Sequence, residues 1–181
     1  ALGHIAENRH IRAALYAAVE RAANLELLAP AVVKTVTAEA GGAIVTLANG
    51  EQIRAALVIA ADGRESPLRT EAGIGVIGWS YPQTGIVATV EHEKPHKGVA
   101  YEHFLPSGPF AILPMTGNRS SLVWTEAKTK APALLALDEA RFNEELARRF
   151  GSHLGKTKAA GPRWSYPLSF HLARDFVRPR L

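Results

Sequence analysis

The sequence predicts an α+β fold in two parts. A helix and a three-stranded β-meander come first, and a mostly antiparallel sheet with one long helix follows. Three observations predict this fold. Apolar residues recur every four positions near the N-terminus, two glycine-containing dipeptides separate alternating runs, and short β-like runs dominate after residue 79. We therefore expect domains at 1–79 and 80–172, with 173–181 returning to the first domain.

The first predicted element is an amphipathic helix in the stretch ENRHIRAALYAAVERAAN. Ile11, Leu15 and Val19 form an apolar stripe, and charged residues fall off that stripe. Asn8 is the expected N-cap, because its short polar side chain can accept a hydrogen bond from a free backbone amide.

A three-stranded meander is predicted over residues 31–61. The dipeptides Gly41-Gly42 and Asn49-Gly50 allow the positive φ angles that tight hairpins require. The last strand ends in an unbroken apolar run that stops at Asp62, so we expect it to be fully buried. A short helix follows, with Ser66 as N-cap and proline at its first position.

The second part reads as an antiparallel sheet. Four β-like runs, TGIVATVEHE, GVAYEHFLP, FAILPM and SSLVWTE, are separated by Pro, Gly and Asn. The stretch LDEARFNEELARRFG then predicts a helix that Asp138 caps and Gly151 ends. A final strand is predicted at RWSYPLSF.

Composition excludes several classes of protein. The chain has 181 residues and a net charge of +4, but its basic residues are scattered, so nucleic-acid binding is not expected. It has no cysteine, which excludes disulfides and thiolate metal sites. The histidines at 92, 96 and 103 lack further well-spaced ligands, so no metal site is expected. The stretch GIGVIG (73–78) matches a dinucleotide fingerprint in letters only, because it follows a helix instead of a strand.

The abrupt break in ALVIAADGRESPLR (56–69) raises a chemical question. A carboxylate at the end of a buried strand needs partners, and the glycine after it permits a sharp turn or a close approach. Arg64 and Arg69 would suit phosphate oxygens. Equally, Asp62 could only cap the turn while both arginines are solvated, and the residues alone leave the two readings open.

Aromatic residues on the β-like runs also have two readings. Phe110 and Trp124 could belong to the core of the sheet or to the wall of an apolar ligand pocket. The sequence alone favours the core.

The stretch IAADGRESPLR resembles the Asp-Gly motif of flavin-dependent aromatic hydroxylases, which have the p-hydroxybenzoate hydroxylase fold. The 49-residue block from GWSYPQ to SLVWTE resembles one branch, the ubiquinone-biosynthesis hydroxylases that oxidise polyprenylated phenols. GHIAENRHIRAAL and YPLSFHLARDFVRPRL fit this branch too. The first domain would then be a remnant of a Rossmann-like FAD-binding domain, and the chain an internal fragment without the glycine-rich and Gly-Asp motifs of that family.

The resemblance also implies site residues. Asp62, Gly63 and Arg64 would lie at the FAD, and His4 and Arg9 near its pyrophosphate. The substrate would meet one face of the sheet, which we expect to be partly exposed: Phe110, Ile112, Pro114 and Trp124. Thr116 stands where p-hydroxybenzoate hydroxylase has a substrate-binding arginine, which argues against a small aromatic acid as substrate.

The implied activity is that of an FAD-dependent monooxygenase that uses NAD(P)H and oxygen to hydroxylate a prenylated phenol. The fragment alone is expected to be flavin-free and inactive. A cytoplasmic location is expected, with peripheral association with the inner membrane or a biosynthetic complex. Two alternatives remain: a flavoprotein reductase or halogenase of the same fold, and a flavin-free ligand-binding module.

Overall fold

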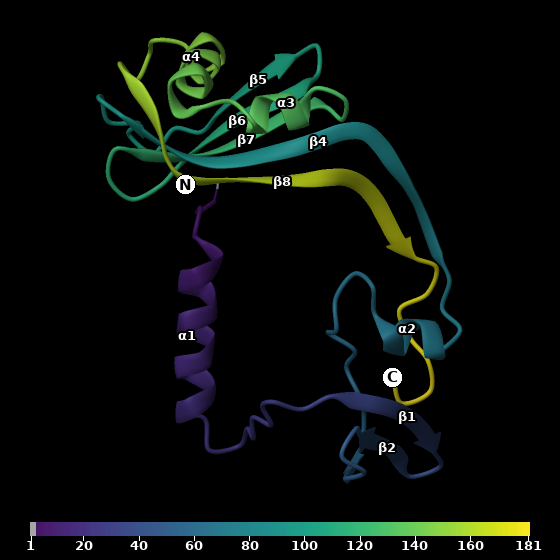
Figure 1. Cartoon of the computed structure of the whole chain (residues 1–181). Coiled ribbons are helices and arrows are strands. Elements are labelled where there is room, and N and C mark those ends of the chain that lie inside the picture. The colour runs from purple at the N-terminus through teal and green to yellow at the C-terminus, as the bar shows by residue number, and fades with distance from the viewer. Residues whose placement is uncertain (1–2) are drawn as a thin grey trace. The chain divides into compact units, whose positions relative to one another are not determined.

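The computed structural model describes residues 3–181, and the fold is α+β with antiparallel sheets, as predicted. The chain divides into two compact units (Figure 1). One holds the described residues up to Ala13 together with Ser80–Ser169. The other holds Ala14–Trp79 and Phe170–Leu181. The pattern change that we noted near residue 79 falls at the same position.

The first unit is built on a five-stranded sheet in the order β5-β6-β7-β4-β8 (Figure 1). β6 pairs antiparallel with β5 and with β7, and β7 pairs antiparallel with β4. The last strand is about twice as long as the predicted RWSYPLSF. The strands are β4 (Val76–His92), β5 (Tyr101–Leu105), β6 (Gly108–Pro114), β7 (Arg119–Ala127) and β8 (Thr157–Ala173).

Helices α3 (Ala131–Leu135) and α4 (Glu139–Phe150) follow β7, and α4 packs on one face of this sheet. α4 begins as predicted, because the Asp138 carboxylate accepts a hydrogen bond from the Arg141 amide at 2.8 Å. It ends at Gly151, whose φ of +79° suits glycine. Phe142, Leu146 and Phe150 of α4 are fully buried against the sheet.

The two faces of the sheet differ sharply. Phe110 lies opposite Trp124, and Ile112 lies opposite Leu122, and all four side chains are buried beneath α4. Because side chains alternate along a strand, the intervening residues point to the other face. That face carries partly exposed apolar side chains, and we call it the open face of the sheet. Its central members are Val87, Ala111, Leu113 and Val123.

The second unit contains a smaller antiparallel sheet of β1 (Val33–Glu39), β2 (Gly42–Leu47) and β3 (Gln52–Ala55). The predicted meander is therefore present, but its last strand is wrong, because β3 stops at Ala55. The following apolar run is exposed, with Leu57 at 60% and Ile59 at 82%. A strand of this kind is buried only when both faces are covered. Here the Val58 amide donates to the Arg180 carbonyl at 2.9 Å, and the Arg180 guanidinium donates to the Ala56 carbonyl at 3.5 Å, but the apolar side chains stay exposed.

Helix α1 (Asn8–Arg21) is also present as predicted, but its apolar stripe is not covered. No residue of α1 is buried, and Ile11 and Leu15 are exposed. The proposed N-cap is wrong by one residue. The Glu7 carbonyl accepts the first helical bonds, from the amides of His10 at 2.9 Å and Ile11 at 3.3 Å. Asn8 is already inside the helix.

Candidate functional site

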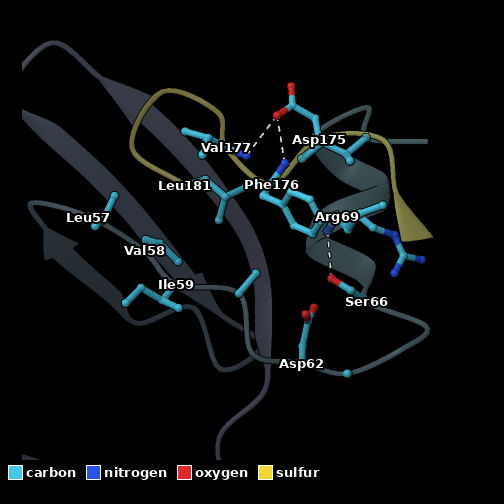
Figure 2. A pocket seen from close by; sticks show the side chains of 14 residues that line it. Leu57, Val58, Ile59, Asp62, Ser66, Arg69, Asp175, Phe176, Val177 and Leu181 are labelled. Atoms are coloured by element: carbon cyan, nitrogen blue, oxygen red, sulfur yellow. Dashed lines mark hydrogen bonds between the residues drawn. The ribbon is translucent and has the colours of Figure 1, made fainter. Parts of the chain in front are cut away.

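The second unit contains a hollow of about 440 Å³ beside the Asp-Gly loop (Figure 2). Three segments of this unit form it: the apolar run before Asp62, the loop with helix α2 (Pro67–Glu71), and the C-terminal segment after Ala173. Most of its lining is apolar, and its polar groups gather on the Asp-Gly loop and at Asp175. The lining residues are Leu57, Val58, Ile59, Ala60, Asp62, Gly63, Ser66, Arg69, Ile74, Ala173, Asp175, Phe176, Val177 and Leu181.

Asp62 is held in place by the start of α2. Its carboxylate accepts a hydrogen bond from the Leu68 amide at 3.2 Å. A hydrogen bond from the Ser66 side chain lowers the pKa of Asp62 below its ordinary value, and the Leu68 amide and the charge of Arg69 act in the same direction. Asp62 is therefore ionised at neutral pH, and it both caps α2 and lines the hollow. The capping role of Asp62 is therefore present, and its role toward a ligand stays a prediction.

Ser66 and Arg69 complete this corner of the hollow. The buried Ser66 hydroxyl accepts a hydrogen bond from the Arg69 amide at 2.9 Å, as expected of an N-cap (Figure 2). The Arg69 guanidinium donates to the Arg64 carbonyl at 2.6 Å, and its Nε–H is buried without an acceptor among the described residues. The resemblance named neither residue for the cofactor, although the residues alone had suggested that Arg69 would suit a phosphate oxygen. The sequence signal was the spacing of these residues: Ser66, an N-cap, and Arg69, a cation, lie three residues apart and shortly after Asp62.

The C-terminal segment forms the opposite wall. The Asp175 carboxylate accepts hydrogen bonds from the amides of Phe176 at 2.8 Å and Val177 at 3.3 Å, which folds the chain into a turn (Figure 2). Arg178 makes an ion pair with Asp175. Arg180 reaches the Ala40 carbonyl at 3.0 Å and so ties this segment to the meander.

The other predicted cofactor residues lie outside the hollow. The Arg64 side chain is exposed, and its Nε pairs with Glu65 at 3.2 Å. His4 and Arg9 are exposed residues of the other unit, where Arg9 pairs with Glu7 at 2.8 Å. Only Asp62 and Gly63 of the five nominees line the hollow. The roles of all five in cofactor binding stay predictions.

The structure corrects the expected exposure of the predicted substrate wall. Phe110, Ile112, Pro114 and Trp124 do share one parity, but the first, second and fourth are at most 1% exposed and belong to the core beneath α4. The expectation that they are partly exposed is wrong for these three, because α4 covers the face that we took to be open. Pro114 is partly exposed, at the end of β6. Contact of any of the four with a substrate stays a prediction.

The histidines of the sheet unit have structural partners. His92 contacts the Lys94 carbonyl at 2.8 Å and the Ser120 hydroxyl at 3.1 Å. His96 bonds the Met115 carbonyl at 2.7 Å and accepts from the Gly98 amide at 2.9 Å. Within residues 3–181, no group of three or more His, Cys, Asp or Glu side chains is placed to hold a metal ion.

The profile of the FAD binding domain family matches residues 7–171. The match covers most of the chain, so the chain belongs to the FAD binding domain family, as the resemblance of the Asp-Gly stretch implied.

Two curated relatives specify the branch. The chain is 51% identical over 180 residues to ubiquinone hydroxylase UbiL of Rhodospirillum rubrum, covering 99% of this chain and 42% of that protein. It is 35% identical over 182 residues to 3-demethoxyubiquinol 3-hydroxylase of Escherichia coli, covering 99% of this chain and 46% of that protein. The predicted resemblance to ubiquinone-biosynthesis hydroxylases is confirmed. The chain spans less than half the length of both relatives.

Solved structures show the same fold. The flavin-dependent halogenase CmlS superposes with a TM-score of 0.70 over 95% of this chain and 33% of its own length. The two sequences are 16% identical, so the likeness concerns the fold alone and does not favour a halogenase.

Proposed function

We propose that this chain is part of an FAD-dependent monooxygenase that hydroxylates the aromatic ring of a prenylated phenol in ubiquinone biosynthesis, using NAD(P)H and oxygen. The observation that carries the proposal is the 51% identity to ubiquinone hydroxylase UbiL across 99% of the chain. The similarity to 3-demethoxyubiquinol 3-hydroxylase supports the same reaction class.

The residues of the hollow fit part of FAD. Arg69 supplies a positive charge and a buried Nε–H that has no acceptor in residues 3–181, which suits a phosphate oxygen. The ionised Asp62 suits a ribose or ribityl hydroxyl, because a carboxylate only accepts hydrogen bonds. Gly63, at a φ of +94°, keeps the loop in a conformation that side chains disfavour. The bound flavin supplies the redox chemistry, and these residues would bind and orient it.

The open face of the sheet is our candidate for the substrate side. Ala111, Leu113 and Val123 are apolar and only partly buried there, which suits an aromatic ring or a prenyl tail. Thr116, in place of a substrate-binding arginine, agrees with a substrate that lacks a carboxylate. These side chains would hold the ring and exclude water from it.

The test uses the full-length protein that contains this chain, loaded with FAD. With NAD(P)H and oxygen, a prenylated phenol should gain one oxygen atom by mass spectrometry, and p-hydroxybenzoate should not. Arg69→Gln should weaken FAD binding, whereas Arg54→Gln, at an exposed arginine of β3 outside the hollow, should not. Failure to hydroxylate any member of a prenylphenol series, despite bound FAD, would overturn the proposed reaction.

We also propose that the protein works in the cytoplasm and associates peripherally with the inner membrane, where a prenylated substrate would dissolve. Among the described helices, none is long and apolar enough to cross a bilayer. Flotation with lipid vesicles containing a prenylphenol should carry the full-length protein upward. Protein that stays at the bottom both with and without vesicles would contradict the association.

A further inference from the structure

The sheet unit contains a second hollow, of about 410 Å³, beside α3 and α4. All of its lining residues belong to this one unit and lie on the face of the sheet that the helices cover, away from the open face. Polar residues line it together with an apolar wall. Its lining residues are Glu126, Thr129, Lys130, Ala133, Leu134, Leu137, Glu145 and Arg149.

The unusual residue in this hollow is Glu126, near the end of β7. Its side chain lies on the same face as Trp124, and the residue is only 5% exposed. One carboxylate oxygen, Oε1, accepts from the Ala127 amide at 2.9 Å. Within residues 3–181, the other oxygen has no hydrogen-bond partner, and no cation lies within 4.0 Å of the carboxylate. This second oxygen is not one of the atoms buried from solvent, so it opens to the hollow, where a positively charged ligand can satisfy it.

Of the other charged residues of the lining, Glu145 and Arg149 are paired with each other, and Lys130 is exposed and makes no ion pair with Glu126 within residues 3–181. Glu145 pairs with Arg148 at 2.9 Å and with Arg149 at 2.5 Å. The Arg149 guanidinium also lies 4.4 Å from the centre of the Trp124 ring, so its position is set by the core and by Glu145. Arg149 is therefore not the partner of Glu126, although both residues line the hollow.

The lining combines a carboxylate with apolar surface, and this combination favours a ligand with a cationic group on an alkyl stem. Leu134 and Leu137 are partly buried and give apolar surface to the same hollow that Glu126 lines. A ligand that satisfies both features carries several N–H donors and a positive charge at the end of an alkyl stem. The stem would cover the leucines, as lysine and arginine stems cover apolar surfaces elsewhere.

We propose that the Glu126 hollow binds an ammonium or guanidinium group on an alkyl stem. The group can come from a free alkylamine or from a lysine or arginine side chain of a protein partner. The site is independent of the proposed hydroxylation, because it uses none of the residues that line the Asp62 hollow or the open face of the sheet.

Fluorine NMR of the chain labelled with fluorotryptophan tests the proposal with n-pentylamine as the probe. Trp124 lies two residues before Glu126 on the same face of β7, whereas Trp79 and Trp164 are exposed and serve as internal references. We expect a saturable shift of the Trp124 resonance with n-pentylamine and none with n-pentanol, which has the same stem without the charge. No saturable shift, or an equal response to n-pentanol, would overturn the proposal.

Glu126→Gln keeps the shape of the side chain and removes its charge, so n-pentylamine should bind at least about tenfold more weakly. Glu144→Gln, at an exposed α4 residue outside the hollow, is the matched control and should bind as the native chain does. Thermal unfolding verifies that both variants are folded. If Glu126→Gln does not fold, Glu126→Asp replaces it. Equal binding by native chain and a folded Glu126 variant would refute the assignment.

A second probe, N-acetyl-lysine methylamide, distinguishes the two sources of the cationic group, a free alkylamine and a side chain of a protein partner. Tighter binding than n-pentylamine would support a side chain of a protein partner, because the probe carries the flanking peptide groups. Tighter binding of n-pentylamine would support a free amine. Absence of binding by both probes would overturn the proposal.

Discussion

Replacing Phe110 by alanine tests whether the aromatic residues of β6 and β7 belong to the core or to a ligand wall. Phe110 is fully buried, and its ring centre lies 5.7 Å from that of Trp124. Removal of such a side chain leaves a cavity and destabilises a domain by about 3–5 kcal/mol. Set against a typical domain stability of roughly 5–15 kcal/mol, this is a large loss. With a slope of about 2 kcal/mol per molar urea, the unfolding midpoint should fall by roughly 2 M.

Urea unfolding followed by circular dichroism measures this loss, and Phe104→Ala is the matched control. Phe104 lies on the neighbouring strand β5, and it is 84% exposed. Its removal should change the free energy of unfolding by less than about 0.5 kcal/mol. If Phe110→Ala cost as little as Phe104→Ala, Phe110 would not be a core residue, and the ligand-wall reading would regain support.

Four further outcomes are expected. Ser66→Ala should destabilise the α2 region by about 1 kcal/mol through loss of the N-cap, measured by hydrogen exchange, and unchanged exchange at α2 would contradict the capping role. In an NMR titration, the pKa of Asp62 should lie below its ordinary 3.8, so its contribution to stability is present above that pH and is lost as pH falls through the lowered value. The pKa of His153 should lie below its ordinary 6.5, because stacking on the Phe150 ring partly desolvates it and the nearby His103 and His92 disfavour its charged form; stability should therefore fall as pH drops below 6.5, and a titration at or above 6.5 would disprove this. The 181-residue chain, mixed with excess FAD and desalted, should retain little flavin by absorbance, whereas near-stoichiometric retention would refute this expectation.

Local signals in the sequence predict most elements of the fold. The cap at Asp138 and the glycine at 151 delimit α4, and the two glycine-containing dipeptides place the hairpins of the meander. Each of these features depends on a few neighbouring residues. The burial of an element depends instead on what covers it, and for this reason the run after Ala55 was expected to be buried and is exposed.

The site was predictable to a smaller degree, for the same reason. Strand alternation groups Phe110 and Ile112 correctly, but it does not say which face α4 covers. The partial exposure that the resemblance implied is wrong for these two residues, whereas the core reading that the sequence favoured for Phe110 agrees with its burial. Asp62 and Gly63 stand out because a polar pair interrupts an apolar run. Ser66 was recognised only as a cap, since its hydrogen bond to Asp62 depends on the folded path of the loop.

The alternation of faces on the main sheet separates two kinds of evolutionary constraint. At Ile112 and Trp124, a change of volume disturbs the packing under α4, so only substitutions of similar size should persist. Their neighbours Leu113 and Val123 are free of that restriction, because their side chains leave the core. Substitutions at Leu113 and Val123 should thus alter what the sheet contacts at a smaller cost in stability than substitutions at Ile112 and Trp124. The sheet can diversify among related proteins while its helix-covered side stays nearly constant.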